Sequence, residues 1–426
     1  MGTEKNHRQR YLDVLQEELI PAMGCTEPIA LAYAAAKARS LLGQVPTAVA
    51  VQASGSIIKN VKSVVVPNTR GLRGIGVAAA AGIVAGREDL ELQVLSQITA
   101  EQIEEIHGFL KQTPIAVSPM LDCRLFDILV SVSAGAHSAA VRICDSHTNV
   151  VYLEQDGQAV LDTTADAGEE TGPDRSFLTM EGIWNFVQTA ALADLEPLLT
   201  PQMTHNWAIA GEGLRGGYGA NVGQTILFLY GGGLTGQACA MAAAASDARM
   251  NGCELPVVIN SGSGNQGITA SVPVLAAAKQ LHSSHEQTLR ALALSNLIAI
   301  HEKTGVGRLS AYCGAVCAGA GAGAGIAYLH GGTFDTICAT VTNALAVVSG
   351  MVCDGAKASC AAKIAVAVQA GIFGYQMTQV GQTFHGGDGI VGGDVEETIY
   401  NVGLLAREGM AQTNQKIIGI MTDAHK

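Results

Sequence analysis

The chain of 426 residues is poor in positive charge, in aromatic residues and in charged residues of any kind. Its 25 lysines and arginines are outnumbered by 37 aspartates and glutamates, which gives a net charge of −12 at neutral pH. An acidic chain of this kind is not expected to bind nucleic acid or an anionic membrane surface. No basic segment followed by an apolar one opens the sequence, so we predict no secretory signal and a cytoplasmic protein.

Long runs of the large apolar residues that lipid favours are also missing. Residues 311–353 carry few charges, but the stretch "GAVCAGAGAGAGIAYLHGG" consists mainly of glycine and alanine rather than leucine and valine. We therefore interpret this region as the closely packed centre of a soluble protein. With 48% hydrophobic residues the chain can form a large core and two domains, and this apolar content is compatible with a homodimer.

Residue periodicity predicts an α+β fold, in which a largely α-helical bundle with buried Ala/Gly-rich central helices accompanies a smaller α/β module. Residues 1–45 are expected to form helices that pack on the helical domain. Residues 46–160 are expected to form the α/β module. Within it, 46–66 reads as strands around a Ser-Gly turn, and 126–160 reads as an antiparallel meander. The polar segment 162–176 is predicted to be a linker.

Residues 161–426, which include this linker, are expected to form an all-α domain. Long alanine-rich segments punctuated by glycine carry few charges on any face. Helices that are apolar on all sides lie in the interior of a domain.

A cysteine stands at the start of a predicted helix in "PAMGCTEP". Thr26 is a candidate N-cap, which places Cys25 directly before the helix. The partial positive charge of a helix N-terminus favours a thiolate over a thiol. A thiolate here would serve as a base, a nucleophile or a metal ligand; the alternative is a buried cysteine that acts as a small apolar residue.

Four of the ten cysteines lie close together in the C-terminal part of the chain: Cys313, Cys317, Cys353 and Cys360. In one continuous helix Cys353 and Cys360 would be about 10 Å apart along the axis. The intervening Asp354 and Gly355 are a helix stop, which would allow the two sulfurs to converge. The alternative is a set of cysteines buried in alanine-rich helices.

Polar side chains alternate with glycines in "NSGSGNQG", just ahead of an apolar segment. Such a loop can form an anion-binding nest at a helix start, suited to a carboxylate or phosphate. A loop that merely caps the helix explains the pattern equally well. The candidate ligand-binding residues here and in "SGSIIKN" are Ser56, Asn60, Ser261, Ser263, Asn265 and Gln266.

Taken together, "PAMGCTEP", "NSGSGNQG", "GRLSAYCGAV" and "GMVCDGAKASCAAK" resemble the iron–sulfur L-cysteine desulfidase family, which is distantly related to the iron–sulfur L-serine dehydratases. The resemblance spans essentially the whole chain, with the motifs in family order. It implies a [4Fe–4S] cluster held by Cys313, Cys353 and Cys360, with one iron left open, so that 161–426 would be the cluster-binding domain. The position matching the family's acid/base residue is Cys25.

The reaction implied by this resemblance converts L-cysteine and water to pyruvate, ammonia and hydrogen sulfide, a carbon–sulfur lyase step of cysteine catabolism. The substrate would be a small amino acid, held at its carboxylate by the 261–266 loop and oriented by Ser56 or Asn60. Cys317 remains an alternative cluster ligand. Two alternative functions remain open: a [4Fe–4S]-dependent L-serine dehydratase, and a non-enzymatic metal-binding or sensory protein.

Overall fold

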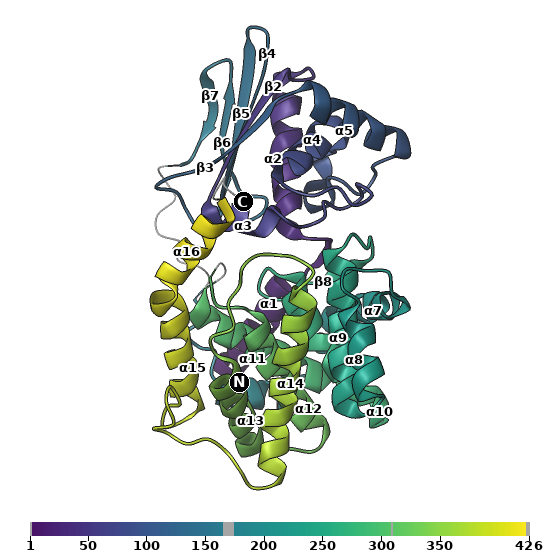
Figure 1. Ribbon diagram of the computed structural model, residues 1–426. Coiled ribbons are helices and arrows are strands. Elements are labelled where there is room, and N and C mark those ends of the chain that lie inside the picture. The colour runs from purple at the N-terminus through teal and green to yellow at the C-terminus, as the bar shows by residue number, and fades with distance from the viewer. Residues whose placement is uncertain (1, 165–173, 308–309, 423–426) are drawn as a thin grey trace.

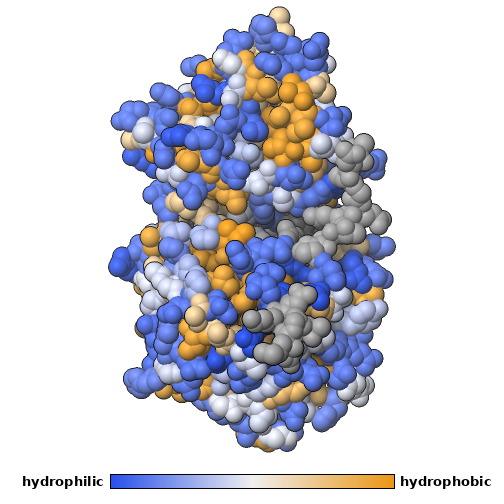
Figure 2. Space-filling view, turned by 180° about the vertical axis from the view of Figure 1, so that it is seen from behind, coloured by the Kyte–Doolittle hydropathy of each residue, from blue (hydrophilic) through white to orange (hydrophobic). Residues whose placement is uncertain are grey.

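The computed structural model describes residues 2–164, 174–307 and 310–422, which form a small upper lobe and a larger helical lobe (Figure 1). The predicted linker 162–176 lies largely outside the described residues. Seen from behind, hydrophilic residues dominate the surface and apolar residues gather in patches on both lobes (Figure 2). No helix in the described part of the chain is long and apolar enough to cross a membrane.

The small lobe is a six-stranded sheet in the order β3-β2-β4-β5-β6-β7, with helices against one face (Figure 1). β2 pairs in parallel with β3, and all other neighbours are antiparallel, so the predicted meander is confirmed. The strands are β2 (Ala48–Ala53), β3 (Ile115–Pro119), β4 (Asp127–Ala134), β5 (His137–Cys144), β6 (Val150–Gln155) and β7 (Gln158–Asp162). The helices are α2 (Thr26–Leu42), α3 (Gly55–Val61), α4 (Ile75–Ala85), α5 (Ala100–Gln112) and the short 3₁₀ turn η1 (Glu88–Gln93).

One local prediction in this lobe is wrong. The "SGSIIKN" segment was expected to turn into a second strand, but it forms α3. Ser54 caps this helix, because its hydroxyl accepts a hydrogen bond from the Ile57 N–H at 3.3 Å. The same hydroxyl donates to the Leu125 carbonyl at 2.6 Å, which ties the helix start to the neighbouring loop.

The larger lobe is a bundle around α12, whose alternating glycines and alanines are buried. A Cβ on Gly319 would lie 2.5 Å from the Ala367 carbonyl oxygen of α14, so only glycine permits this close approach. The predicted α+β class and its buried Ala/Gly-rich helices are thus confirmed. The helices are α1 (Gly2–Glu18), α6 (Met180–Thr189), α7 (Leu192–Arg215), α8 (Val222–Tyr230), α9 (Leu234–Met250), α10 (Gly264–Gln280), α11 (His285–Val306), α12 (Ala315–Leu329), α13 (Phe334–Val348), α14 (Cys360–Gln379), α15 (Val395–Leu404), the π-helical turn η2 (Leu405–Gly409) and α16 (Ala411–Thr422).

The N-terminal segment joins the two lobes instead of packing on one of them. α1 contributes Tyr11 and Leu15 to the helical core, whereas α2 contributes Ile29 and Leu31 to the core of the small lobe. Between them, β1 (Pro21–Met23) pairs with β8 (Pro256–Val258). The predicted unit 1–45 is therefore divided between two cores, and its division places the start of α2 at the junction.

Candidate functional site

A cavity of about 710 Å³ lies at the junction of the two lobes. The small lobe contributes the start of α2, the end of α3 and two loops, while the helical lobe contributes the start of α10 and the segments around three cysteines. Ser56 is buried but is not part of the lining, so the structure gives it no contact with the site. All the other predicted site residues line this one cavity: Cys25, Asn60, Ser261, Ser263, Asn265, Gln266, Cys313, Cys353 and Cys360.

Backbone pairing brings Cys313 and Cys353 together although 40 positions separate them in the sequence. The Cys313 N–H donates to the Met351 carbonyl at 2.9 Å, and the Cys353 N–H donates to the Ala311 carbonyl at 2.6 Å. Cys360 is the first residue of α14, after a loop that follows the end of α13. The predicted break between Cys353 and Cys360 is confirmed, and three separate segments bring their thiols to one wall of the cavity.

Gly355 shapes the loop between these cysteines. Its φ is +95°, and an added Cβ would lie 2.1 Å from the Lys59 carbonyl oxygen. A side chain at this position is therefore excluded both by the backbone conformation and by the contact with α3. The Gly355 carbonyl accepts hydrogen bonds from the Cys360 thiol at 3.5 Å and from the Lys357 ammonium at 3.1 Å.

The three thiols lie close enough to affect one another's ionisation. The pKa of Cys313 is raised to about 12, mainly by burial and in smaller part by the neighbouring Cys353 and Cys360. The ammonium of Lys59 donates to the Cys353 carbonyl at 3.3 Å, and the side chain of Lys363 donates to Asp354 beside it. These two cations beside the Cys353 segment would offset part of the negative charge of a bound cluster.

Cysteine thiols contributed by three separate segments are a donor set of the kind that holds an iron–sulfur cluster. Thiolates around one zinc ion lie about 4 Å from one another. Within the described ranges, no three His, Cys, Asp or Glu side chains converge closely enough to hold one ion. Cysteines that bind three different irons are spaced more widely. Cys313, Cys353 and Cys360 all line the same cavity, together with Lys59 and Lys363.

Cys317, the alternative ligand, does not line the cavity that contains these three thiols. It is fully buried in α12. Its strongest ionisable influence is the buried Glu302, and burial raises the pKa of both side chains well above their usual values. The structure therefore places Cys317 in the core.

Cys25 is the N-cap of α2, one residue earlier than predicted, with extended backbone angles of φ −87° and ψ 132°. Its thiol donates a hydrogen bond to Glu27 Oε2 at 3.1 Å. Burial raises the pKa of the Cys25 thiol well above its ordinary value, and the Glu27 charge raises it further. The expected thiolate is therefore wrong for the free protein, because these two effects exceed the helix N-terminal effect.

Glu27 was not predicted, although it stands in the same motif. Its Oε2 also accepts from the Thr26 hydroxyl at 3.2 Å, and its Oε1 accepts from the Asn60 amide at 2.9 Å. Burial would raise the pKa of Glu27, but the nearby charge of His147 and the Cys25 hydrogen bond lower it on balance. An ionised carboxylate thus borders the cavity beside Cys25.

The "NSGSGNQG" loop forms a tight turn at the start of α10. Ser261 and Gly262 have φ values of 49° and 76°, and Asn260 and Ser263 close the turn with two backbone hydrogen bonds of 3.0 and 3.1 Å. Ser263 is the N-cap, but its hydroxyl forms no capping bond. Gln266 Oε1 is buried and, among the described atoms, has no hydrogen-bond partner. Polar groups at a helix N-terminus therefore face the cavity.

Arg249, near the end of α9, is a second residue that sequence reasoning missed. It is only 5% exposed, and its Nη1 donates to Asn265 Oδ1 at 3.2 Å. A Cβ on Gly264 would lie 2.3 Å from Arg249 Nε, so the guanidinium rests on the first residue of α10. The available signal was a lone arginine in the alanine-rich stretch "CAMAAAASDARM".

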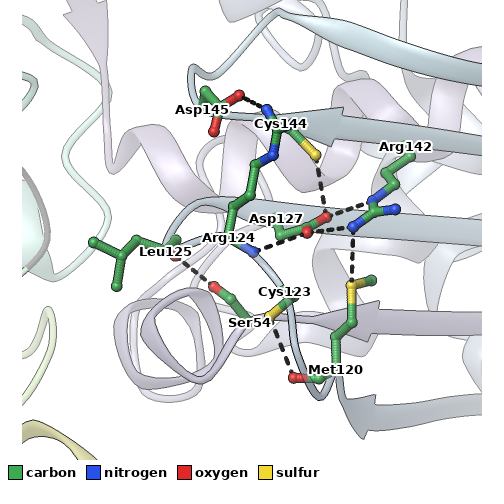
Figure 3. A network of polar contacts seen from close by, with 9 residues as sticks. All are labelled: Ser54, Met120, Cys123, Arg124, Leu125, Asp127, Arg142, Cys144 and Asp145. Atoms are coloured by element: carbon green, nitrogen blue, oxygen red, sulfur yellow. Dashed lines mark hydrogen bonds and ion pairs between the residues drawn. The ribbon is translucent and has the colours of Figure 1, made fainter. Parts of the chain in front are cut away.

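An ion pair between a partly exposed arginine and a buried aspartate supports the loop on the small-lobe side (Figure 3). Asp127 is fully buried and accepts hydrogen bonds from Arg142 Nε at 2.8 Å and Nη2 at 2.6 Å, and from the Cys144 thiol at 3.3 Å. Arg124 forms an ion pair with Asp145 in the same network, and both side chains line the cavity. The network holds this part of the cavity wall in place.

Comparison with known proteins finds a matching family and several relatives that are similar over nearly their whole length. Residues 89–419 match the family described as serine dehydratase alpha chain. A UPF0597 protein of Desulfitobacterium hafniense (strain Y51) is 52% identical over 422 residues, covering 99% of this chain and 98% of the relative. A UPF0597 protein of Lachnoclostridium phytofermentans is 47% identical over 413 residues, covering 97% and 99%. A UPF0597 protein of Treponema denticola is 40% identical over 428 residues, covering 99% of each chain.

Proposed function

The chain belongs to the serine dehydratase alpha chain family, and from that premise we propose that it is a [4Fe–4S]-dependent L-cysteine desulfidase. The reaction eliminates sulfide from L-cysteine. The α-proton is removed, the electrons of that C–H bond form a carbon–carbon double bond, and the electrons of the carbon–sulfur bond leave with sulfur. The resulting enamine tautomerises, and water hydrolyses the imine to pyruvate and ammonia.

One observation carries the proposal. Cys313, Cys353 and Cys360 come from separate segments to the wall of the cavity that also contains Cys25. These three thiols would hold the cluster. When bound, such a cluster with one iron free of protein ligands supplies a soft Lewis acid for a sulfur leaving group.

The remaining chemistry falls to side chains around the cavity. We assign proton removal to Cys25, which must lose its own proton when substrate is bound. The substrate carboxylate would lie at the start of α10, near the Ser263 hydroxyl and the Gln266 amide, where the helix N-terminus favours negative charge. Ser261 and Asn265 shape this turn through their own hydrogen bonds. Asn60 would act indirectly, by orienting Glu27.

L-Serine dehydration is the second candidate, favoured by the family description that residues 89–419 match. The same side chains would serve it, since only the leaving group differs. A hydroxyl is a harder ligand and a poorer leaving group than a thiolate, so this reaction would place greater demand on the cluster.

The test is anaerobic reconstitution followed by assay with L-cysteine and L-serine in parallel. Iron content and visible absorbance are read on the same sample. We expect pyruvate and sulfide in equal amounts from cysteine, and a loss of about 10²- to 10⁴-fold in turnover for Cys25→Ala with iron retained. Cys353→Ala should lose iron as well. Cys338→Ala, a partly exposed cysteine outside the cavity, is the control. Turnover of serine but not cysteine would establish the second candidate instead.

A further inference from the structure

We propose that Arg249 and Glu27 form a clamp for a free α-amino acid, in which Arg249 binds the carboxylate and Glu27 binds the ammonium group. The inference rests on the proposed function, because it names the groups that select the substrate of that site. It adds two specificity-determining residues, one from each lobe, to the cavity.

Arg249 has the properties of a carboxylate site that lacks its ligand. A buried guanidinium is costly unless a carboxylate or several acceptors neutralise it. Here Nη1 has one amide partner, Nε has none among the described atoms, and no described carboxylate forms an ion pair with the side chain. The guanidinium also lies against Gly264 in the first turn of α10, so the helix N-terminus and the side chain favour the same anion.

Glu27 offers the complementary charge. Its carboxylate is ionised and, in contrast to the buried Cys25, the residue is partly exposed within the cavity. Among the described atoms Oε1 accepts one hydrogen bond, from Asn60, and therefore has capacity for an ammonium donor. Asn60 and Thr26 hold the carboxylate in position without neutralising it.

The two charges are close enough to act on the same groups. The Arg249 charge influences the ionisation of both Cys25 and Glu27, yet Arg249 and Glu27 form no ion pair. A zwitterion, whose charged groups sit on one α-carbon, can bridge them. Bound in this way, its α-carbon would lie beside the Cys25 thiol that donates to Glu27.

This arrangement has a consequence for Cys25. An ammonium group on Glu27 would offset the negative charge that holds the Cys25 proton in the free protein. His147 and Arg249 are the other charged groups that act on Glu27. The thiolate of Cys25 would thereby be favoured in the substrate complex and not in the free protein.

The experiment measures binding without turnover. Calorimetry on the reconstituted protein compares L-alanine, which has both groups, with propanoate, which lacks the ammonium, and ethylamine, which lacks the carboxylate. We expect Arg249→Met to weaken L-alanine about 10- to 100-fold, and Glu27→Gln to do the same while leaving propanoate unchanged. Arg215→Met and Glu88→Gln are matched controls outside the cavity and should bind as the wild type does.

Wild-type affinity for L-alanine in both clamp variants would overturn the inference, whatever their activity. If Arg249→Met does not fold, Arg249→Lys decides, because it keeps the buried charge but loses the forked donor set. Elevated KM values for both variants in the cysteine assay would support the clamp. A selective binding pattern in a protein that turns over neither amino acid would support the clamp and reject the proposed function.

Discussion

The substitution Gly355→Ala tests whether the contact between the cysteine loop and α3 positions the proposed cluster ligands. The new Cβ would lie 2.1 Å from the Lys59 carbonyl oxygen. Carbon–oxygen contacts settle at about 3.3 Å or more, so the loop must retreat by about 1 Å. Metal–ligand distances tolerate only about 0.2 Å. Since the Gly355 carbonyl contacts the Cys360 thiol and Cys353 lies two residues earlier, this displacement should prevent stable cluster binding.

Gly350→Ala in the same loop is the matched control. Gly350 also has a positive φ, of 128°, but an added Cβ there would meet no atom within 4 Å. Both substitutions carry a backbone strain of about 1–2 kcal/mol. Only Gly355→Ala adds the packing conflict, which typically costs a further 1–3 kcal/mol or so.

Iron per chain and visible absorbance after anaerobic reconstitution report the outcome, with thermal unfolding of the metal-free proteins beside them. We expect Gly355→Ala to lose most of its iron and Gly350→Ala to keep it. Full iron in both variants would refute the reasoning, because the loop would then absorb the contact without moving the ligands. Equal loss in both would assign the effect to backbone strain instead.

Three further outcomes follow from the geometry. Glu27→Gln should speed alkylation of Cys25 at neutral pH, because the Glu27 charge and hydrogen bond raise the pKa of that thiol. The rate is measured by peptide mass spectrometry, and an unchanged rate would contradict this. Asp127→Asn should lower the free energy of unfolding by about 2–4 kcal/mol in urea titrations, because Arg142 loses a partner that accepts two of its hydrogen bonds. A change below about 0.5 kcal/mol would show that the ion pair is dispensable. Burial raises the pKa of Asp247 to about 6, so its ionisation destabilises the fold as pH rises from about 4 through 6. Asp247→Asn should therefore add up to about 3 kcal/mol at pH 7 and little at pH 4, and a pH-independent gain would contradict the assignment.

The sequence by itself determined those features that depend on neighbouring residues. Thr99 and Gln102 form a capping box at the start of α5, a helix signal that lies within four consecutive residues. The break between Cys353 and Cys360 followed from Asp354 and Gly355, because a helix stop is a local property. Glycine and alanine content likewise predicted the buried α12. The cysteine motifs indicated a shared site only through the family resemblance, because residue periodicity does not show which distant segments meet.

The tertiary structure decided whatever depends on contacts between distant segments. Whether "SGSIIKN" continues as a strand or forms α3 depended on Ser54 and its bond to the Leu125 loop. The protonation of Cys25 followed from burial, which the helix N-terminus alone does not reveal. Arg249 reaches the cavity only because α9 packs beside α10. Charge and solvation act through space, so a residue's ionisation and accessibility are set by neighbours that its local sequence does not name.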